Sequence, residues 1–346
     1  MNKVSFLRKL LIPFSILYSF IMDIRNYLYN KKFLSIYKPD VKIISIGNIS
    51  TGGTGKTPMV IFLAKLFLKS GKKVGIISRG YGRKSKDLVI VSDGTSVNQD
   101  TLQTGDEPAL ISFELIKEFP KLFFVVSSAD RCKAANVIMK NFHPDVILLD
   151  DAFQHRKIHR DKDLVMIDAA DLYSNNFFYK HTLPSGLLRE KFTNLSRADL
   201  IILNFKESEK SKISDQYSAL NSNSKVIKIK YKTEYLIDHK NTILKPDKRP
   251  AVIFSGIARP DSFRYTLKNK GIDILNELIF KDHHEYSQSD IEKLISFYKK
   301  DSVFITTGKD FIKINKFTDF INNFPVYYLN MEIELTENES LLQDLI

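Results

Sequence analysis

The chain has 346 residues, which is long enough for two domains, and its 43% hydrophobic content is that of an ordinary folded protein. A formal net charge of +12 indicates an anionic partner such as a nucleotide or a lipid surface, although a lysine-heavy composition explains it equally well. No nucleic-acid-binding motif accompanies the charge, and the single cysteine, Cys132, excludes a disulfide framework or a cysteine metal cluster and fits a reducing compartment.

Residues 1–34 contain a run of 13 uncharged residues, Leu10–Met22, with basic and aromatic side chains around it. The run is shorter than the roughly 20 residues that a helix needs to span a bilayer, and no signal-peptide cleavage site follows it. Basic and aromatic flanks are typical of a membrane interface. We therefore interpret residues 1–34 as a membrane-associated helix. Packing of this helix on the protein's own core, and a single membrane span, are the alternatives.

A phosphate-binding loop is predicted between a strand at Val41–Ile46 and a helix at Pro58–Phe67. The glycines between them let backbone N–H groups turn toward phosphate oxygens. In such loops the lysine, here Lys56, reaches the β- and γ-phosphates, and the threonine, here Thr57, ligates Mg²⁺. The predicted nucleotide-binding residues are Ser50, Thr51, Gly52, Gly53, Thr54, Gly55, Lys56 and Thr57.

Two positions of this loop depart from known patterns. The P-loop motif has glycine where this chain has Ser50, and the variant loop of partition-type ATPases has a signature lysine where this chain has Thr51. A glycine-rich turn without a ligand is the alternative. The agreement of strand, loop, Lys-Thr pair and helix favours a nucleotide site.

Acidic residues follow in two places. The predicted strand Val146–Leu149 ends in Asp150 and Asp151, a hydrophobic strand followed by acids, which is the pattern of a Walker B magnesium site. Asp106 and Glu107 stand just before a helical pattern, where acidic residues commonly cap the helix. Their alternative role is that of a carboxylate base or a magnesium ligand near the P-loop.

The loop Arg79–Arg83 is a candidate for ligand contact because it follows a predicted strand, and α/β sheets bind ligands at the carboxyl ends of their strands. A plain surface turn is the alternative. Ala152–His155 continues the Asp150–Asp151 loop over the same edge of the sheet, and another loop, Leu183–Glu190, follows the strand predicted at Leu164–Asp168.

Repeated strand–helix units predict an α/β fold with a parallel sheet covered by helices. After residue 207 the chain becomes rich in Ser, Lys and Asn, and Val226–Tyr231 alternates like an exposed strand. A second, smaller α/β unit starts at Ala251. The expected divisions are a membrane-associated helix at 1–34, a P-loop domain at 35–225, a linker with a strand at 226–250 and a smaller domain at 251–346.

Seven motifs together resemble those of one family, the tetraacyldisaccharide 4'-kinases that phosphorylate the lipid A precursor of Gram-negative bacteria. The motifs are Gly47-Asn-Ile-Ser-Thr-Gly-Gly-Thr-Gly-Lys-Thr-Pro58, Arg79-Gly-Tyr-Gly82, Gly105-Asp-Glu-Pro108, Asp150-Asp-Ala-Phe-Gln-His155, Leu183-Pro-Ser-Gly-Leu-Leu-Arg-Glu190, Asp282-His283-His284 and Thr307-Gly-Lys-Asp310. The P-loop of that family also has a small hydroxyl residue where Ser50 stands. Ala152, Ser185 and Gly308 depart from residues common in relatives, and no catalytic role is assigned to Gly308.

The resemblance implies a kinase at the cytoplasmic face of the inner membrane. Such an enzyme transfers the γ-phosphate of ATP, with Mg²⁺, to the 4'-hydroxyl of a tetraacyl-glucosamine disaccharide 1-phosphate. No obligate protein partner and no nucleic acid are implied. The implied fold is a P-loop α/β domain joined by a β-stranded linker to a smaller α/β domain.

The resemblance also implies roles for individual residues. The catalytic base is Asp106 paired with His283 of the second domain, and Lys56 stabilises the phosphoryl group in flight. The implied metal residues are Thr57, Glu107, Asp150 and Asp151. The residues implied on the disaccharide or phosphate side are Asn48, Ser50, Arg79, Tyr81, His155, Arg189 and Glu190.

Two other functions stay open from the residues alone. A membrane-recruited partition-type ATPase would be a switch rather than a metabolic enzyme, and Thr51 argues against it. A soluble small-molecule P-loop kinase would leave the aromatic, basic N-terminus unexplained.

Overall fold

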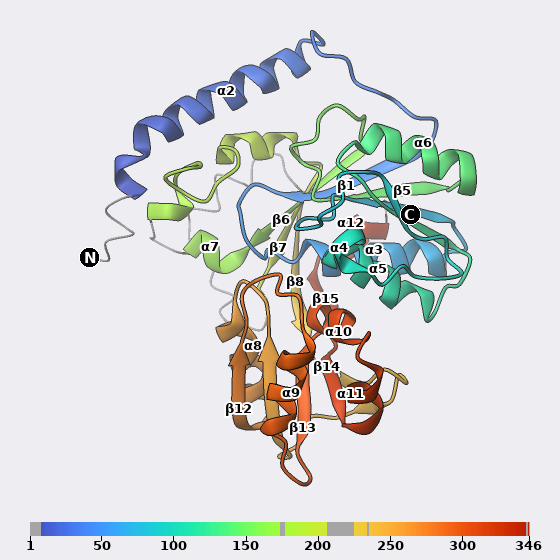
Figure 1. Cartoon of the computed structure of the whole chain (residues 1–346). Helices are drawn as coiled ribbons and strands as arrows, with labels where there is room; N and C mark the ends of the chain where they lie inside the picture. Colours follow the sequence, from blue (N-terminus) through green and yellow to red (C-terminus); the bar gives the residue numbers. More distant parts are fainter. Residues whose placement is uncertain (1–7, 174–176, 206–224, 234, 344, 346) are drawn as a thin grey trace.

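The protein is described by a computed structural model, which covers residues 8–173, 177–205, 225–233, 235–343 and 345. Within these ranges the strands form two sheets (Figure 1). The larger sheet has nine strands in the order β15-β8-β7-β6-β1-β5-β2-β4-β3, and the smaller has six in the order β10-β9-β14-β13-β11-β12. Each sheet and its helices form one lobe, called here the large lobe and the small lobe.

The strands of the large lobe are β1 (Lys42–Asn48), β2 (Val74–Ser78), β3 (Val89–Ser92), β4 (Phe123–Ser127), β5 (Val146–Asp150), β6 (Lys162–Asp168), β7 (Leu200–Asn204), β8 (Lys225–Lys232) and β15 (Glu332–Glu337). Its helices are α2 (Ile12–Asn30), α3 (Lys56–Lys69), α4 (Thr101–Thr104), α5 (Asp106–Ile116), α6 (Arg131–Phe142), α7 (Ala169–Tyr173) and α12 (Ser340–Gln343), with 3₁₀ turns η1 (Phe177–Tyr179) and η2 (Phe192–Arg197).

The strands of the small lobe are β9 (Leu236–Ile237), β10 (Ile243–Leu244), β11 (Pro250–Ser255), β12 (Asp273–Ile279), β13 (Val303–Thr307) and β14 (Val326–Leu329). Its helices are α8 (Pro260–Asn269), α9 (Gln288–Ser296), α10 (Gly308–Ile314) and α11 (Thr318–Asn323).

The central strands of the large sheet are apolar along their whole length because helices cover both faces. All five residues of β2, β4 and β5 are buried. Helices α3 and α5 pack on one face of the sheet and α6 packs on the other. The pairings from β8 through to β4 are parallel, and the edge strands β15 and β3 are antiparallel. The predicted α/β class with a P-loop-type sheet and a second, smaller α/β unit is confirmed.

The expected linker at 226–250 is not a separate element. Strand β8 lies inside the large sheet, paired with β7 on one side and β15 on the other. Its alternation arises because Ile227 and Ile229 enter the core, while Lys228 and Lys230 form ion pairs with glutamates of β15. The lysines that predict an exposed strand therefore lie on the outer face of β8, beside glutamates of a strand more than 100 residues later, and Lys230 remains exposed. Strands β9 and β10, also in this range, belong to the small sheet.

The expected small domain at 251–346 ends early, because the C-terminal segment returns to the large lobe. Strand β15 pairs antiparallel with β8, and Leu342 and Leu345 join the main core of the large sheet. The chain therefore crosses between the lobes twice in this region, once after β8 and once before β15. The two crossings lie side by side, since the Asn330 N–H donates to the Tyr235 carbonyl at 3.0 Å.

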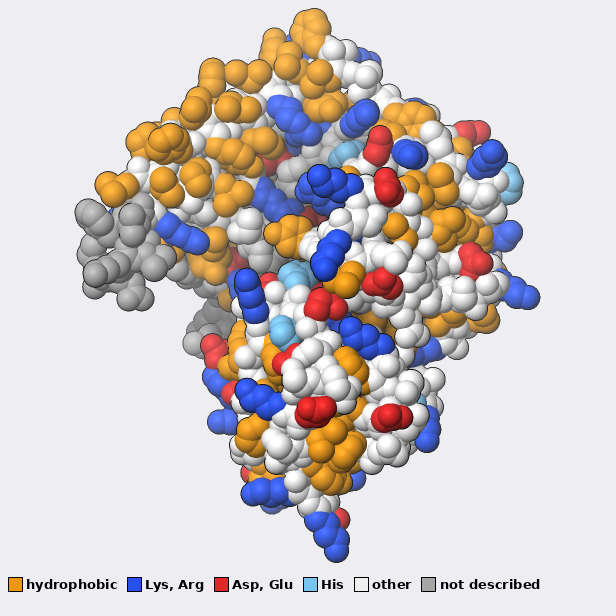
Figure 2. Space-filling view, in the orientation of Figure 1, with side chains coloured by type: hydrophobic (Ala, Val, Ile, Leu, Met, Phe, Trp, Pro, Cys, Tyr) orange, Lys and Arg blue, Asp and Glu red, His pale blue; other side chains and the backbone are white. Residues whose placement is uncertain are grey.

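Helix α2 packs with its polar side inward. Its buried residues are Ser15, Ser19 and Asn26, whereas Leu17 and Phe20 are more than half exposed. Ser15 and Ser19 bind the Thr182–Ser185 segment, with 2.7 Å between Ser19 Oγ and Thr182 Oγ1. Figure 2 shows hydrophobic side chains gathered along this helix. The helix therefore packs on the protein, which was the alternative considered for it, but through its polar side, while Leu17 and Phe20 stay exposed.

Among the helices of the described residues, none combines the length and apolar character that a membrane crossing requires.

Replacing Leu342 with alanine tests the return of the C-terminus. Its side chain is 1% exposed in the main core, so the cavity left by Leu342→Ala should lower the free energy of unfolding by about 2–4 kcal/mol. Urea denaturation measures this change. The neighbouring Gln343 is exposed, and Gln343→Ala should stay within about 0.5 kcal/mol of the native chain. Equal effects of the two substitutions would contradict the placement of α12.

Candidate active site

One large cavity of about 2180 Å³ lies between the lobes and extends to the inner side of α2. It is lined by the phosphate-binding loop, by the carboxyl ends of the large sheet, by the α10 end of the small lobe, and by Tyr18, Met22 and Arg25 of α2. Pockets for single drug-sized ligands are typically about 300–1,000 Å³. The cavity therefore has room for a nucleotide and a second, large ligand.

The phosphate-binding loop has the conformation that the glycines predict. Gly52 and Gly55 have positive φ angles of 112° and 95°. A Cβ at position 55 would lie 2.1 Å from the Tyr231 hydroxyl, so only glycine fits there. Asn204 donates to the Thr54 carbonyl at 3.0 Å and to the Tyr231 hydroxyl at 2.9 Å. The loop is thus supported from β7 and β8.

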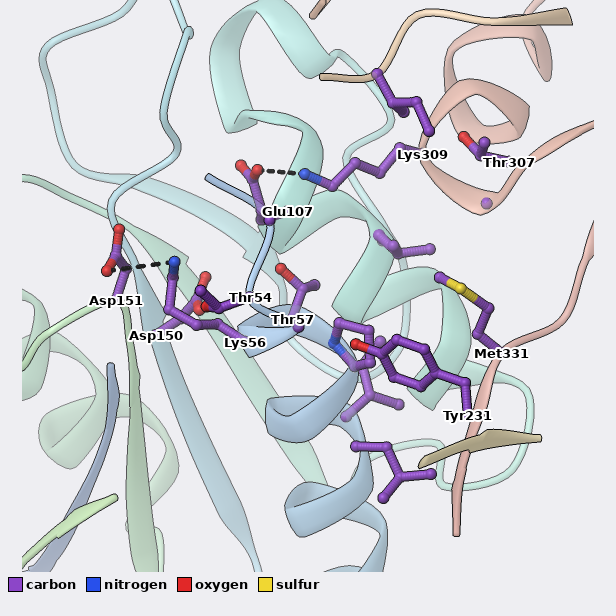
Figure 3. A pocket seen from close by; sticks show the side chains of 18 of the residues that line it. Thr54, Lys56, Thr57, Glu107, Asp150, Asp151, Tyr231, Thr307, Lys309 and Met331 are labelled. Atoms are coloured by element: carbon purple, nitrogen blue, oxygen red, sulfur yellow. Dashed lines mark hydrogen bonds and ion pairs between the residues drawn. The ribbon is translucent and has the colours of Figure 1, made fainter. Parts of the chain in front are cut away.

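Lys56, at the start of α3, faces the acidic end of β5 (Figure 3). Its Nζ lies 3.7 Å from Asp151 Oδ1, which also accepts from Arg189 Nη1 at 2.7 Å. Burial on its own would raise the pKa of Asp151, but the charges of Lys56 and Arg189 outweigh it and bring the pKa below its ordinary value. Asp151 is therefore an ionised partner of two cations.

Asp150 and Glu107 hold unsatisfied negative charge beside Thr57. Asp150 Oδ2 accepts from Ser78 at 2.9 Å, while Asp150 Oδ1 and Glu107 Oε2 are buried oxygens without a hydrogen-bond partner in the described structure. Burial and the charges of Asp151 and Glu107 raise the pKa of Asp150 to about 6. Glu107 Oε1 pairs with Lys309 Nζ of α10 at 2.5 Å (Figure 3).

These acids do not form a ready-made ligand cluster. Among the described residues there is no group of three or more His, Cys, Asp or Glu side chains placed to hold a metal ion. Of the four predicted metal residues, Asp150 and Glu107 have free buried oxygens, Asp151 is paired with cations, and Thr57 is buried at the first turn of α3.

Asp106 and His283, 177 residues apart, come together across the lobes. His283 Nδ1 lies 2.8 Å from Asp106 Oδ2, and the Tyr81 ring packs 5.5 Å from the imidazole ring. The hydrogen bond with Asp106 raises the pKa of His283 above its ordinary value. Burial would raise the pKa of Asp106, but the bond with His283 and the charge of Lys313 bring it below its usual range.

In this pair the histidine is the residue that faces the cavity, and the carboxylate is the buried residue. His283 lines the cavity, whereas Asp106 is 5% exposed and does not. The other ring nitrogen of His283, Nε2, lies 4.0 Å from Asp282 Oδ1 and is the atom left for a ligand, since Nδ1 is engaged by Asp106.

Four of the seven predicted disaccharide or phosphate contacts line the cavity, namely Arg79, Tyr81, His155 and Arg189. Burial, with the charges of Arg131 and Arg160, lowers the pKa of His155 to about 4. His155 is therefore neutral near pH 7. Arg25 and Arg131 also line this part of the cavity, and neither stands in a motif that singled it out.

The other three predicted contacts lie behind the cavity wall. Asn48 is fully buried and donates to Thr54 Oγ1 at 3.1 Å, so it supports the phosphate-binding loop. Ser50 is buried and forms a bridge with Leu188. The Glu190 side chain is fully buried and accepts from Arg197 and from Asn26 of α2. Its place in the structure is that of an anchor for α2.

The fold and this site define a P-loop nucleotide-binding protein of two lobes, with an Asp–His pair assembled by the second lobe. The model of the family described as "Tetraacyldisaccharide-1-P 4'-kinase" matches residues 7–346, and the chain belongs to this family. It is an ATP-dependent kinase of lipid A biosynthesis, as the resemblance implies, and the partition-type ATPase is not favoured.

Three individual proteins illustrate the similarity. The chain is 36% identical to a tetraacyldisaccharide 4'-kinase of Chlorobium phaeovibrioides, over 96% of this chain and 95% of that protein. It is 36% identical to the one of Aquifex aeolicus, over 97% of both chains. A crystal structure of the "apo" form of LpxK from Aquifex aeolicus in complex with ATP aligns over 98% of both chains with a TM-score of 0.81.

The depressed pKa of His155 predicts a pH-dependent stability. Between its folded pKa of about 4 and an unfolded value of ~6.5, the unfolded chain binds more protons, so stability falls as the pH falls through this window. At pH 5 the loss should be roughly 1 kcal/mol after discounting for partial exposure. Between pH 7 and pH 5, the free energy of unfolding of His155→Gln, measured by urea denaturation, should decrease by correspondingly less than that of the native chain.

The matched control is His143→Asn, because His143 is exposed and asparagine tolerates its left-handed backbone. An identical pH dependence of the native chain and His155→Gln would contradict the assigned environment.

Proposed function

We propose that the cavity transfers the γ-phosphate of ATP to the 4'-hydroxyl of a tetraacyl-glucosamine disaccharide 1-phosphate, giving the lipid IVA precursor of lipid A. The observation that supports it best is continuity, since one cavity joins the phosphate-binding loop, the Asp106–His283 pair and the inner side of α2. The direct test is an assay of radiolabelled phosphate transfer to the purified disaccharide 1-phosphate. Absence of an ATP-dependent product would refute the proposal.

The phosphate-binding loop and Lys56 hold the nucleotide. Backbone N–H groups of residues 52–57 and the N-terminus of α3 surround the phosphates, and the Lys56 ammonium balances charge on the transferring group. Asp151 and Arg189 orient Lys56 from the other side. As the acceptor oxygen bonds to the γ-phosphorus, the bond from that phosphorus to the β,γ-bridging oxygen breaks, and ADP leaves with the electron pair.

The Asp106–His283 pair accepts the proton of the acceptor hydroxyl. His283 faces the cavity, so its Nε2 takes the proton while Asp106 holds Nδ1 and stabilises the imidazolium. The pair exists only when the small lobe meets the large one, which links proton removal to exclusion of water. Water exclusion protects ATP from hydrolysis in the absence of the acceptor.

Asp150 and Glu107, with the Thr57 hydroxyl, fit a magnesium ion. The orphaned oxygens Asp150 Oδ1 and Glu107 Oε2 are hard anionic donors of the kind that Mg²⁺ prefers. When bound, the ion would be held by these residues and would supply positive charge that offsets the charge of the nucleotide phosphates. Lys309 occupies the other oxygen of Glu107 and keeps that carboxylate oriented from the small lobe.

The acceptor side combines cations with an apolar wall. Arg25, Arg79 and Arg131 provide positive charge for a sugar phosphate, and Tyr18 and Met22 of α2 line the same cavity. We propose that α2 lies on the cytoplasmic face of the inner membrane with its exposed apolar side in the lipid, so that acyl chains reach the cavity beside it.

The Asp–His pair predicts strong and non-additive losses. Asp106→Ala and His283→Ala should each lower kcat by about 10²–10³-fold. The kcat of the double variant should equal that of the less active single variant, because the two residues act as one unit. ATP binding, measured by calorimetry, should stay within about threefold.

The control is His284→Asn, since the ring of His284 pairs with Asp290 at 3.1 Å and not with Asp106. Its loss in kcat should be below about tenfold. Multiplicative losses in the double variant would show that the pair does not work as a unit.

The orientation of α2 predicts its lipid binding. Leu17, Phe20 and Ile24 are 43–60% exposed on one side of the helix. Replacing all three with serine should weaken binding to phosphatidylglycerol vesicles by about tenfold or more, as measured by sedimentation, because apolar area is lost from the lipid interface.

The matched control replaces Ile90 and Ile279, two exposed isoleucines away from α2, with serine. This variant should bind vesicles like the native chain. Equal binding by all three proteins would argue against α2 as the membrane contact.

A further inference from the structure

Helix α10 of the small lobe presents two lysines, one helical turn apart, to two consecutive acids of the large lobe. Lys309 Nζ pairs with Glu107 Oε1 at 2.5 Å, and Lys313 Nζ pairs with Asp106 Oδ2 at 2.7 Å. Residues four apart share one face of a helix, so both lysines meet the first turn of α5 together. The two lobes therefore contact each other through a double ion pair.

The two lysines differ in exposure. The Lys313 side chain is 0% exposed, whereas that of Lys309 is 32% exposed and lines the cavity. A fully buried lysine is rare unless it is paired, because its charge loses the stabilisation of water. Lys313 does not line the cavity. Its role must therefore be exercised through the residues that it touches.

Lys313 touches both parts of the Asp–His pair. Besides Asp106 Oδ2, its Nζ donates to the backbone carbonyl of His284 at 3.1 Å, next to His283 in the chain. His283 has a φ of 59°, a left-handed conformation that is unfavourable for a residue with a Cβ. Lys313 thus binds both the loop that carries His283 and the Asp106 carboxylate to which His283 is hydrogen-bonded.

The acid of α10, Asp310, completes this support. Asp310 is fully buried and accepts from the Gly256 N–H at 3.0 Å and from the Thr307 hydroxyl at 2.7 Å. The Gly256 carbonyl in turn accepts from the His283 N–H at 3.1 Å. One turn of α10 therefore holds the His283 loop at two points, through Asp310 and through Lys313.

We propose that Lys313 is a positioning residue for phosphoryl transfer, which fixes the Asp106 carboxylate through Oδ2 and aligns it with Nδ1 of His283. This proposal rests on the function proposed above for the Asp–His pair. During the step the acceptor proton moves to His283 Nε2, while Lys313 takes no part in the proton transfer. Lys313 contacts neither the nucleotide nor the acceptor.

The test compares Lys313→Met, which keeps the length of the side chain and removes its charge, with the native chain. The expected loss in kcat is about 10–100-fold, with the KM values for ATP and acceptor within about threefold, because only the aligned pair is disturbed. In an Asp106→Asn background the same substitution should lower kcat by less than about twofold. Equal losses in both backgrounds would overturn the proposal.

Lys117→Met is the matched control. Lys117, the residue that follows α5, also crosses between the lobes by donating to the Tyr328 hydroxyl at 2.7 Å, and its partners Tyr328 and Glu114 do not include Asp106. Its kcat should stay within about twofold of native. If Lys313→Met does not fold, Asp106→Asn is compared with Asp106→Asn/Lys313→Met, where no buried charge of that pair is left unpaired. A further large loss there would refute a role through Asp106.

Nitrogen NMR of the His283 ring gives a readout that needs no acceptor. The Nδ1 resonance should shift in Lys313→Met and stay unchanged in Lys117→Met, since only the first lysine holds its partner. No shift would overturn the proposal. If the native chain phosphorylates no disaccharide, the proposed function fails while this readout still decides the role of Lys313. If the native chain does so and Lys313→Met behaves like Lys117→Met, the positioning role alone fails.

Discussion

The charge pairing between α10 and the first turn of α5 is the contact on which the active site depends. Asp106 and Glu107 are adjacent acids at the end of a sheet that already carries Asp150 and Asp151. Four carboxylates brought together without counter-charges would repel one another. The small lobe supplies His283, Lys309 and Lys313, and the large lobe supplies Lys56 and Arg189. The lobes are thereby held in the arrangement that assembles the reactive groups.

Local patterns identified what is local in this site. The strand, glycine loop and helix around Lys56, and the acids that end β5, are contiguous in sequence, so their chemistry was predictable from spacing. The contact between Asp106 and His283 was not predictable from spacing, because no periodicity relates residues 177 positions apart. Only the resemblance to a family proposed that pair. The pairing of β15 with β8 was not predicted for the same reason. The alternating lysines of β8 give the same sequence pattern whether their neighbours are water molecules or the glutamates of another strand.

Three predicted contacts do not line the cavity, and for two of them the cause is the alternation of an extended segment. Ser50 and Glu190 stand beside Thr51 and Arg189, which do line it, and neighbouring residues of an extended segment point to opposite sides. Asn48 ends β1 and is buried against Thr54. Arg189 reaches Asp151, and its neighbour Glu190 turns inward to Arg197 and Asn26. Lys313 was invisible for another reason. A lysine in sequence is expected at the surface, and its burial follows from a carboxylate on the other lobe.

The inward polar side of α2 links this N-terminal helix to the phosphate-binding loop. Tyr18 donates to the carbonyl of Arg189, the guanidinium of Arg189 binds Asp151, and Asp151 faces Lys56. A helix that merely anchored the protein would need no such contacts, and its polar residues would face water. Because the apolar side is left outward instead, the same helix can contact lipid while its other side forms a wall of the cavity. A displacement of α2 would therefore be transmitted through Arg189 and Asp151 to Lys56.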